Sequence, residues 1–333
     1  MCKQLFPFFS QLGNPAFEVL DKLPDGLHQA VGGSDFPVQV ADIRLDTTLF
    51  HLPDSSDFKF LTETLKVPES FLNDIADTDE RPRTETEGNW LLTILRIPVQ
   101  NAQSSIPYTT VPIGIITNNE IIVSVCYHQT DMIPDFIEHT RRKGIEVRNK
   151  LDLIFRLIYS SAVWFLKYLK QINIDITAAE KELERSIRNE DLLRLMKLQK
   201  TLVYFNTSIR GNEVMIGKLK TIFQDTDYLD EELVEDVIIE LKQAFNTVNI
   251  YSDILTGTMD AFASIISNNV NAIMKRMTSL SITLMIPTLI ASFYGMNVDI
   301  HLEEMPHAFL LIILVSVFLS ALSFVIFRKI KWF

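Results

Sequence analysis

Residues 277–298 read MTSLSITLMIPTLIASFYGMNV, and none of these 22 residues carries a formal charge. A second run of 23 residues, 305–327, has His307 as its only titratable group. About 20 apolar residues at ~1.5 Å each cross a hydrocarbon core of ~30 Å. We therefore predict two transmembrane helices, since the buried core helices of soluble proteins rarely stay free of charge for so long.

The charged residues are divided sharply around these two spans. Residues 1–276 hold 39 acidic and 28 basic residues, and they therefore carry the whole net charge of −11. Lys275 and Arg276 precede the first span, and residues 328–333 form a basic tail after the second. The loop between the spans, 299–304, contains three acids and no base: Asp299, Glu303 and Glu304. The positive-inside rule then predicts a multi-pass protein of the cell (inner) membrane with both termini in the cytoplasm.

The composition excludes several classes of protein. A net charge of −11 disfavours a nucleic-acid binder, because such a protein needs a basic face. The two cysteines, Cys2 and Cys126, form neither a disulfide framework nor a C-x-x-C motif. The motifs G-x-x-x-x-G-K, G-x-G-x-x-G, G-x-S-x-G and H-E-x-x-H are absent, and the six histidines are scattered. We therefore do not expect an enzyme.

Residues 1–135 are expected to form a mixed α/β cytosolic domain, since proline and glycine punctuate short apolar runs there. Five runs are candidate strands: Phe36–Ile43, Thr48–Leu52, Trp90–Pro98, Thr110–Thr117 and Ile121–Tyr127. The step Thr117-Asn118-Asn119-Glu120 indicates a hairpin between the last two runs. Phe58–Leu65 and Pro68–Asp77 are expected to be short helices.

Residues 136–276 are expected to be helical. Asn149–Gln171 predicts an apolar-rich helix, and Thr177–Thr207 has a mixed-charge face typical of a solvated helical hairpin arm. Leu229–Ile286 contains no proline and one glycine, which predicts a stalk helix of about 60 residues and ~90 Å that runs into the first span. The predicted fold is an α+β membrane protein with an N-terminal α/β domain, a long stalk helix and two C-terminal transmembrane helices.

One face of the first span, and of the stalk directly before it, is polar and rich in methionine. Its residues recur in alternating steps of three and four: Asn271, Met274, Thr278, Ser281, Met285, Thr288 and Ser292. Such a face is either a packing seam against other helices or the lining of a water-filled pore. Two helices cannot enclose a pathway. A pore would therefore require a cyclic homo-oligomer, with the apolar second span as its outer, lipid-facing ring.

The outer end of the first span offers oxygen ligands. Glycine and asparagine in Tyr294-Gly295-Met296-Asn297 can end the helix and turn backbone carbonyls and a carboxamide toward the axis of such a ring. Mg²⁺ sheds its water reluctantly and is often bound through its hydration shell. A ring of neutral asparagine oxygens can hold the hydrated ion without trapping it, so that conduction remains possible.

This tetrapeptide, at the end of the first of two C-terminal spans, resembles the signature of the CorA family of magnesium transporters. The tail Arg328–Phe333 is similar to the ending of that family, and Ser267–Lys275 resembles its inner pore entrance. The resemblance implies a homopentameric funnel with an inner ring of first spans. Its implied partners are other copies of the chain, the lipid bilayer and divalent cations.

The resemblance also implies roles for single residues. Gly295, Met296 and Asn297 would form the selectivity filter, with Asn297 as the outer ring that meets hydrated Mg²⁺. Met274 and Met277 would form a hydrophobic constriction on the cytoplasmic side. Together with the polar stripe, this gives the expected pore-lining residues: Asn271, Met274, Met277, Thr278, Ser281, Met285 and Thr288.

The extracytoplasmic loop departs from the family pattern. The family usually has Met-Pro-Glu soon after the motif, whereas this chain has Glu303-Glu304-Met305-Pro306-His307, which is longer and ordered differently. The loop acids Asp299, Glu303 and Glu304 are still expected to concentrate cations near the outer mouth.

A run of carboxylates lies near the start of the predicted stalk helix. Between Lys220 and Lys242 there are eight acids and no base. A solvated acidic face is the simpler interpretation for most of them. The resemblance favours a regulatory divalent site made by Asp236 and Asp260 of the stalk and Asp74 of a neighbouring α/β domain. Mg²⁺ bridging these acids would favour a closed ring, so high cytosolic Mg²⁺ would shift the population toward closure.

The sequence thus predicts a divalent-cation channel or transporter for Mg²⁺ influx, with Mg²⁺ as both cargo and regulator. Without an ATPase motif the membrane potential must drive it, at about 2.3 kcal/mol per charge per 100 mV. Two alternatives remain open. One is a related carrier for Zn²⁺, Co²⁺ or Ni²⁺, and the other is a membrane-anchored metal sensor that does not transport.

Overall fold

Two compact units, residues 1–255 and residues 256–333, make up the chain, and each is described by itself. The structure is a computed structural model that describes residues 47–101, 105–186, 188–224, 226, 228–296, 307–330 and 332. The strand expected at Phe36–Ile43 lies outside the described residues.

The first unit is built on a five-stranded sheet with the order β1-β5-β4-β3-β2. Its strands are β1 (Thr47–His51), β2 (Arg83–Glu87), β3 (Trp90–Gln100), β4 (Tyr108–Thr117) and β5 (Ile122–Cys126). β1 pairs with β5 in parallel, and the other pairs are antiparallel. The four predicted strands that fall on described residues are confirmed, and so is the hairpin, where the Asn118 amide donates to the Ile121 carbonyl at 3.1 Å.

Strand β2 was not predicted, because its sequence Arg-Thr-Glu-Thr-Glu contains no apolar residue. It forms an edge of the sheet and pairs with β3 from Arg83–Ile94 to Glu87–Trp90. An edge strand has no need of a continuous apolar face, and charged side chains there discourage pairing with another chain. The usual period-two signal of a half-buried strand is therefore missing.

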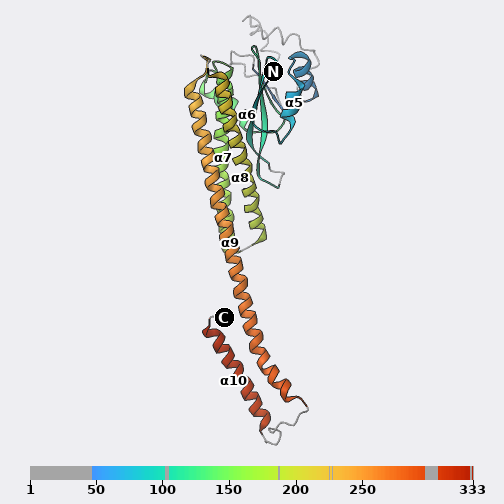
Figure 1. The fold of residues 1–333 in the computed structure, drawn as a ribbon, viewed down its shortest axis with the longest axis vertical. Coiled ribbons are helices and arrows are strands. Elements are labelled where there is room, and N and C mark those ends of the chain that lie inside the picture. The colour runs from blue at the N-terminus through green and yellow to red at the C-terminus, as the bar shows by residue number, and fades with distance from the viewer. Residues whose placement is uncertain are drawn as a thin grey trace. The chain divides into compact units, whose positions relative to one another are not determined.

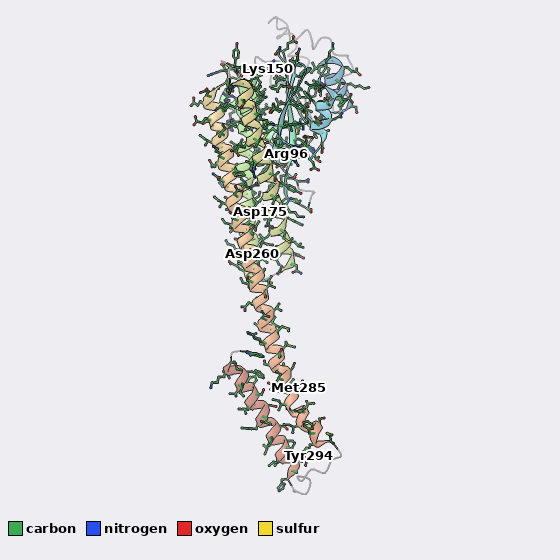
Figure 2. The ribbon with its side chains drawn as sticks, in the orientation of Figure 1. Arg96, Lys150, Asp175, Asp260, Met285 and Tyr294 are labelled. Carbon is green, nitrogen blue, oxygen red and sulfur yellow. The ribbon has the colours of Figure 1, made fainter. Side chains whose placement is uncertain are left out.

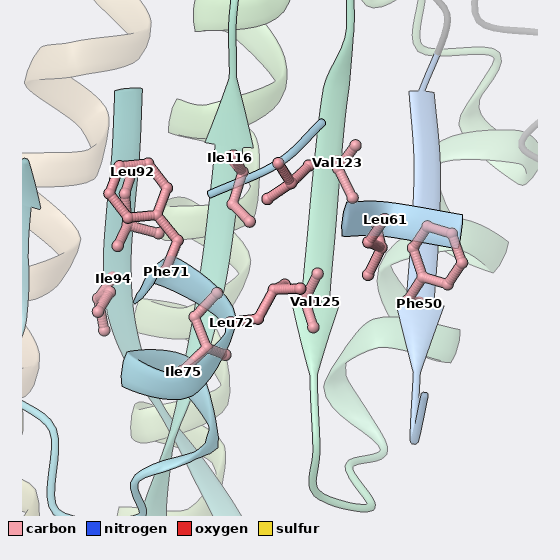
Figure 3. Packing of buried hydrophobic residues seen from close by; sticks show 11 residues of the cluster. Phe50, Leu61, Phe71, Leu72, Ile75, Leu92, Ile94, Ile116, Val123 and Val125 are labelled. Atoms are coloured by element: carbon pink, nitrogen blue, oxygen red, sulfur yellow. The ribbon is translucent and has the colours of Figure 1, made fainter. Parts of the chain in front are cut away.

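Short helices cover one face of the sheet and close a hydrophobic core. They are α4 (Ser55–Lys59), a π-helical turn η2 (Phe60–Thr64) and α5 (Glu69–Ala76), which confirm the two predicted short helices with shifted boundaries. Figure 3 shows Phe71, Leu72 and Ile75 of α5 among residues of the sheet. Gly114 of β4 permits this close approach, because a Cβ there would overlap the Ile75 side chain.

Long helices pack against the sheet from its other face (Figure 1). They are α7 (Lys150–Arg185) and α8 (Asn189–Phe223), and α6 (Met132–Lys143) packs against α7. α7 and α8 pack along each other, with the rings of Phe165 and Phe205 5.1 Å apart. The helix predicted at Asn149–Gln171 therefore continues to Arg185, and the predicted arm at 177–207 consists of the end of α7 and the start of α8.

A buried asparagine of α8 completes the hydrogen bonding of β3. The first residue of β2, Arg83, pairs with Ile94 of β3. The backbone of Arg96 lies beyond this pair and has no partner in β2. Asn212 takes that place: its Oδ1 accepts from the Arg96 amide at 3.0 Å, and its Nδ2 donates to the Arg96 carbonyl at 2.8 Å. Because Asn212 is fully buried, these bonds satisfy polar groups that would otherwise be costly in the core.

The predicted stalk is confirmed as α9 (Glu231–Tyr294), a single 64-residue helix. Its buried residues in the first unit recur every three, four or seven positions: Val234, Val237, Leu241, Ala244, Val248 and Leu255. This spacing is that of a coiled-coil seam, and Asn206 of α8 donates to Asn249 beside it. α9 is longer than the predicted stalk because it continues through Pro287, which membrane helices tolerate.

The second unit contains the rest of α9 and α10 (Ala308–Lys329). The Ser320 hydroxyl of α10 donates to the Thr283 carbonyl of α9 at 3.3 Å, so the two helices are in contact. Ser279 of α9 and Ser316 of α10 are buried. We call these four residues, Ser279, Thr283, Ser316 and Ser320, the hairpin seam. Small side chains of this kind let two membrane helices approach closely.

Candidate functional site

The polar and methionine stripe is exposed on α9 in the single chain. Its expected pore-lining members are Asn271, Met274, Met277, Thr278, Ser281, Met285 and Thr288, and all seven are exposed. Met274, Met277 and Met285 keep 61%, 60% and 64% of their surface accessible, and Met285 is labelled in Figure 2. Large apolar side chains left so open on one face mark a surface for another chain or for lipid.

The stripe faces away from α10. At about 100° per residue, the centre of the stripe falls nearly opposite Ser279 and Thr283 on the surface of α9. The sequence left open whether the stripe is a packing seam or a pore lining. Within the described part of the chain, α9 uses the hairpin seam to contact α10, and the stripe is left for water, for lipid or for other copies of the chain.

The C-terminal end of α9 is Tyr294, directly before the glycine of the motif (Figure 2). The Gly295 amide donates to the Ala291 carbonyl at 2.9 Å, and the Met296 amide donates to the Phe293 carbonyl at 3.4 Å. The left-handed φ of a common glycine cap is found at Gly144 but not at Gly295. Four other predicted site residues lie outside the described residues: Asn297, Asp299, Glu303 and Glu304.

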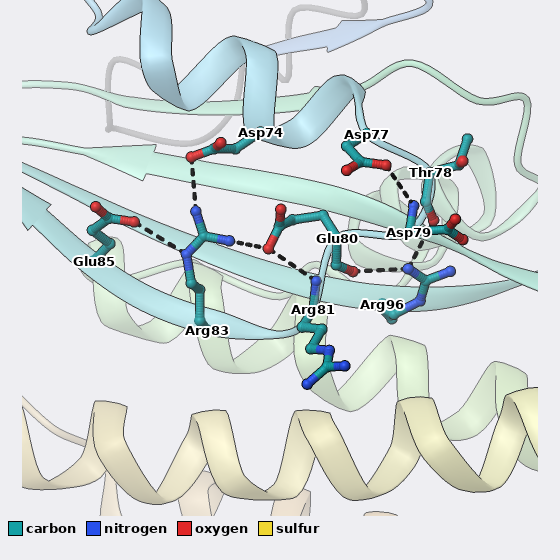
Figure 4. A network of polar contacts seen from close by, with 9 residues as sticks. All are labelled: Asp74, Asp77, Thr78, Asp79, Glu80, Arg81, Arg83, Glu85 and Arg96. Carbon is teal, nitrogen blue, oxygen red and sulfur yellow. Dashed lines mark hydrogen bonds and ion pairs between the residues drawn. The ribbon is translucent and has the colours of Figure 1, made fainter.

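Asp74, the first of the three predicted regulatory carboxylates, forms an ion pair with an arginine side chain. Arg83 Nη2 lies 2.7 Å from Asp74 Oδ2. The same guanidinium contacts Glu80 and, at 3.1 Å, Glu85, so one positive charge is shared among three carboxylates (Figure 4). The sequence prediction missed Arg83 because β2, which carries it, was not predicted as a strand.

A second arginine holds the segment between α5 and β2. Arg96 Nη1 donates to the carbonyls of Thr78 and Glu80, each at 2.8 Å (Figure 4). Its Nε donates to Thr110 Oγ1 at 3.1 Å, and Thr110 in turn bonds Ser208 of α8 at 2.7 Å. Burial lowers the pKa of Arg96, although nearby carboxylates favour its charge. This anchor fixes the backbone that presents Glu80 to Arg83.

The two predicted regulatory carboxylates of the stalk are exposed and lie apart from each other. Asp236, in the first unit, and Asp260, in the second, are both exposed on α9. Among the described residues, no group of three or more His, Cys, Asp or Glu side chains is placed to hold a metal ion. The described chain therefore presents separate carboxylates at the predicted regulatory positions and no formed cage for a cation.

Two helices in the described residues, α9 and α10, are long and apolar enough to cross a membrane. Only 6% of the most apolar window of each is buried, whereas the core helix of a soluble protein would be mostly buried. An α/β body, a helix that continues into an apolar hairpin, and a polar stripe on that hairpin together define a membrane protein of the ion-transporter class.

The family follows from comparison with known proteins. The CorA-like Mg²⁺ transporter protein family matches residues 49–329, and the chain belongs to this family. The cobalt/magnesium transport protein CorA of Methanocaldococcus jannaschii is 24% identical over 300 residues, which cover 89% of this chain and 93% of the relative. The protein of the same name from Thermotoga maritima is 24% identical over 272 residues, which cover 78% of this chain and 75% of the relative.

Solved structures share the fold. The complete structure of the CorA magnesium transporter from M. jannaschii has a TM-score of 0.74 at 22% identity, and the match covers 90% of this chain and 95% of that one. The full-length CmaX protein has a TM-score of 0.65 at 14% identity, with 86% and 88% covered. The predicted architecture of an α/β domain, a long helix and two C-terminal candidate membrane helices is thereby confirmed.

Proposed function

We propose that the chain forms a homopentameric channel for Mg²⁺ influx across the cell (inner) membrane, with both termini in the cytoplasm. Its spans would be residues 277–298 and 305–327, joined by an extracytoplasmic loop at 299–304. Membership of a family of divalent-cation transporters supports transport as the activity. The names of two relatives, which specify cobalt and magnesium transport, support the choice of cargo.

The observation that carries this proposal is the exposed stripe on α9, nearly opposite the hairpin seam. Copies arranged around one axis would turn their stripes inward and keep α10 on the outside. The inner ring would then present hydroxyls, carboxamides and thioethers to a hydrated cation. The outer ring would present the apolar side chains of α10 to lipid.

In this arrangement the two ends of the first span have different tasks. At the outer mouth, Gly295, Met296 and Asn297 form the selectivity filter, and neutral Asn297 oxygens bind the hydration shell of Mg²⁺. The loop acids Asp299, Glu303 and Glu304 raise the local cation concentration. At the inner end, Met274 and Met277 form a ring of thioethers that closes by excluding water.

The membrane potential drives influx, at about 2.3 kcal/mol per charge per 100 mV, and cytosolic Mg²⁺ closes the ring. Exposed Asp236 and Asp260 are the regulatory ligands that the geometry supports best. Asp74 is already compensated by Arg83, so it contributes to a metal site only where that ion pair opens. Mg²⁺ between copies would stabilise the closed ring by its higher affinity for that state.

Substitution of Asn297 tests the proposal. Asn297→Ala should abolish Mg²⁺ uptake into proteoliposomes, because it removes the carboxamide ring at the outer mouth. Size-exclusion chromatography and membrane extraction should show unchanged assembly and insertion. If a correctly assembled Asn297→Ala protein takes up Mg²⁺ as fast as the wild type, Asn297 does not form the selectivity filter.

A carrier preferring other divalent cations is the second candidate. The cytoplasmic domain of ZntB from Vibrio parahaemolyticus shares the fold of the soluble part, with a TM-score of 0.53 at 14% identity, over 68% of this chain and 88% of that one. The names of two relatives also include cobalt. Competition of Co²⁺, Ni²⁺ and Zn²⁺ against Mg²⁺ uptake ranks the ions. A protein that binds these ions without moving any of them would instead be a membrane-anchored sensor.

A further inference from the structure

Four basic side chains lie at one level of the second unit. Lys275 and Arg276 are on α9, Arg328 and Lys329 end α10, and all four are exposed. The two helices are antiparallel and joined by the Ser320–Thr283 hydrogen bond. Since each residue rises ~1.5 Å, Arg276 is level with Phe327 and Arg328. We call these four residues the basic belt.

No described carboxylate opposes the basic belt. Asp260 is the only acidic residue among the described residues of the second unit, and it precedes Arg276 by roughly 24 Å of helix. The ion pairs between described residues include none of the four cations. These four exposed positive charges are therefore available to an anionic partner.

Helical periodicity divides the basic belt into two pairs. At about 100° per residue, Arg276 and Arg328 fall on one side of the plane that contains both helix axes. Lys275 and Lys329 fall on the other side. The two arginines can therefore converge on one ligand, and the two lysines provide a pair of equal charge for comparison.

An aromatic pair lies beside the arginines. Phe327 is on the face of α10 toward α9, and the Trp332 ring stacks on it at 5.6 Å with an angle of 23°. The Trp332 amide donates to the Phe327 carbonyl at 3.0 Å, which folds the end of the chain back onto α10. Indole rings next to basic residues are typical of the membrane–water interface.

We propose that Arg276 and Arg328 bind the phosphate of one acidic phospholipid at the cytoplasmic surface. Guanidinium groups form paired, charge-assisted hydrogen bonds with phosphate oxygens, and clustered cations beside a span attract anionic lipids. The inference rests on the proposed function in one respect, since the hairpin must be inserted in a membrane. A lipid bound here would tie the inner end of the first span, next to Met277 in the interior of α9, to the end of α10.

Tryptophan quenching tests the site in the full-length protein. Of the three tryptophans, Trp90→Phe and Trp164→Phe leave Trp332 as the reporter. The protein is reconstituted in phosphatidylcholine vesicles that contain equal fractions of either brominated phosphatidylglycerol or brominated phosphatidylcholine. We expect phosphatidylglycerol to quench Trp332 more strongly. Arg276→Gln with Arg328→Gln should remove that preference, whereas Lys275→Gln with Lys329→Gln should keep it.

Three results would overturn the lipid site. Equal quenching by the two lipids in the starting protein means that no acidic lipid is selected. An equal loss of preference in both double variants means that only general charge attraction acts. Loss of the preference on adding inorganic phosphate means that the arginines take the free anion.

Mg²⁺ uptake in the same vesicles separates this inference from the proposed function. If the protein takes up Mg²⁺ but Trp332 quenching shows no preference for phosphatidylglycerol, the lipid site is contradicted and the proposed function is not. A lipid preference without uptake leaves the lipid site standing and removes transport. Both double variants are compared only after size-exclusion chromatography shows the assembly of the starting protein.

Discussion

Cys126 illustrates how burial sets the chemistry of a single residue. It is fully buried at the end of β5, and its Sγ donates to the His128 carbonyl at 3.3 Å. Burial raises the pKa of the Cys126 thiol from 9.0 to about 11. Between these two pH values the native chain holds a proton that the unfolded chain releases. The associated stabilisation is therefore present below pH 9.0 and is lost as the pH rises through about 11.

Alkylation of Cys126 checks this residue-scale claim. In a Cys2→Ser background, iodoacetamide should react with the native protein at pH 9 about fiftyfold more slowly than with a denatured control, because the thiolate fraction follows the shifted pKa. The rate should rise toward pH 11. If the alkylation rate of the native protein, plotted against pH, had its midpoint at pH 9, the Cys126 thiol would not be buried as described.

Asp74 shows which part of the candidate site the sequence could supply. A carboxylate near Arg81-Pro82 was expected to be a metal ligand, yet its partner in the folded chain is Arg83. That pairing depends on α5 and β2 meeting across the sheet. Spacing along the sequence carries no such information, since β2 has neither apolar residues nor a buried face. Residue types in a motif were therefore easier to predict than their partners.

At the scale of helices and strands, hydropathy predicted most of the elements. β3, β4 and β5 are apolar, and the hairpin residues between β4 and β5 are typical turn formers. The helix that begins at Lys150 was predicted too short, because the charged residues after Thr177 were interpreted as a separate arm, although Ile172, Ile176, Ala179 and Leu183 continue its buried stripe. The stripe on α9 lies on another face than the contact with α10, and its role as a pore lining stays a prediction.

Met274 and Met277 provide the prediction at this scale. Met274→Asp and Met277→Asp should each weaken the closed state, since a ring of carboxylates wets a constriction and attracts cations. Proteoliposomes loaded with high internal Mg²⁺ should then show several-fold faster uptake than those with the wild type. Ile273→Asp is the matched control, because Ile273 is equally exposed but lies off the stripe. Uptake by the methionine variants no greater than that of the wild type or of Ile273→Asp would place the gate elsewhere.

At the scale of the whole molecule, regulation is expected to depend on carboxylates from several copies of α9. Asp236→Lys and Asp260→Lys would supply the positive charge of a bound ion, whereas Asp236→Ala and Asp260→Ala would remove the ligands without supplying it. The Lys variants should therefore resist limited proteolysis with less dependence on Mg²⁺ than the wild type, and the Ala variants should lose protection by Mg²⁺.

The control for this experiment is Asp253→Lys, an exposed acid on the same helix. It should keep the Mg²⁺ dependence of the wild type. If all the Asp236 and Asp260 variants also keep that dependence, the acidic run of the stalk is a solvated face and the sensor lies elsewhere.

The architecture of the whole chain was the most predictable property, because two long uncharged runs and one proline-free stalk leave few alternatives. The assembly was less predictable, since it depends on contacts between copies that a single chain does not contain. The predicted selectivity filter shares this limit: Gly295 and Met296 follow α9, but a ring of Asn297 would exist only in an oligomer. The homopentamer therefore stays a prediction.

Mg²⁺ uptake by the purified full-length protein in liposomes is the most direct test of the central claim. Uptake is followed with a radioactive magnesium tracer, once with a potassium diffusion potential that is negative inside and once without a potential. We predict uptake that increases with the potential, falls when the vesicles are preloaded with Mg²⁺, and is lost in Asn297→Ala. Uptake no faster than in protein-free vesicles, by protein that is inserted and oligomeric, would contradict the account.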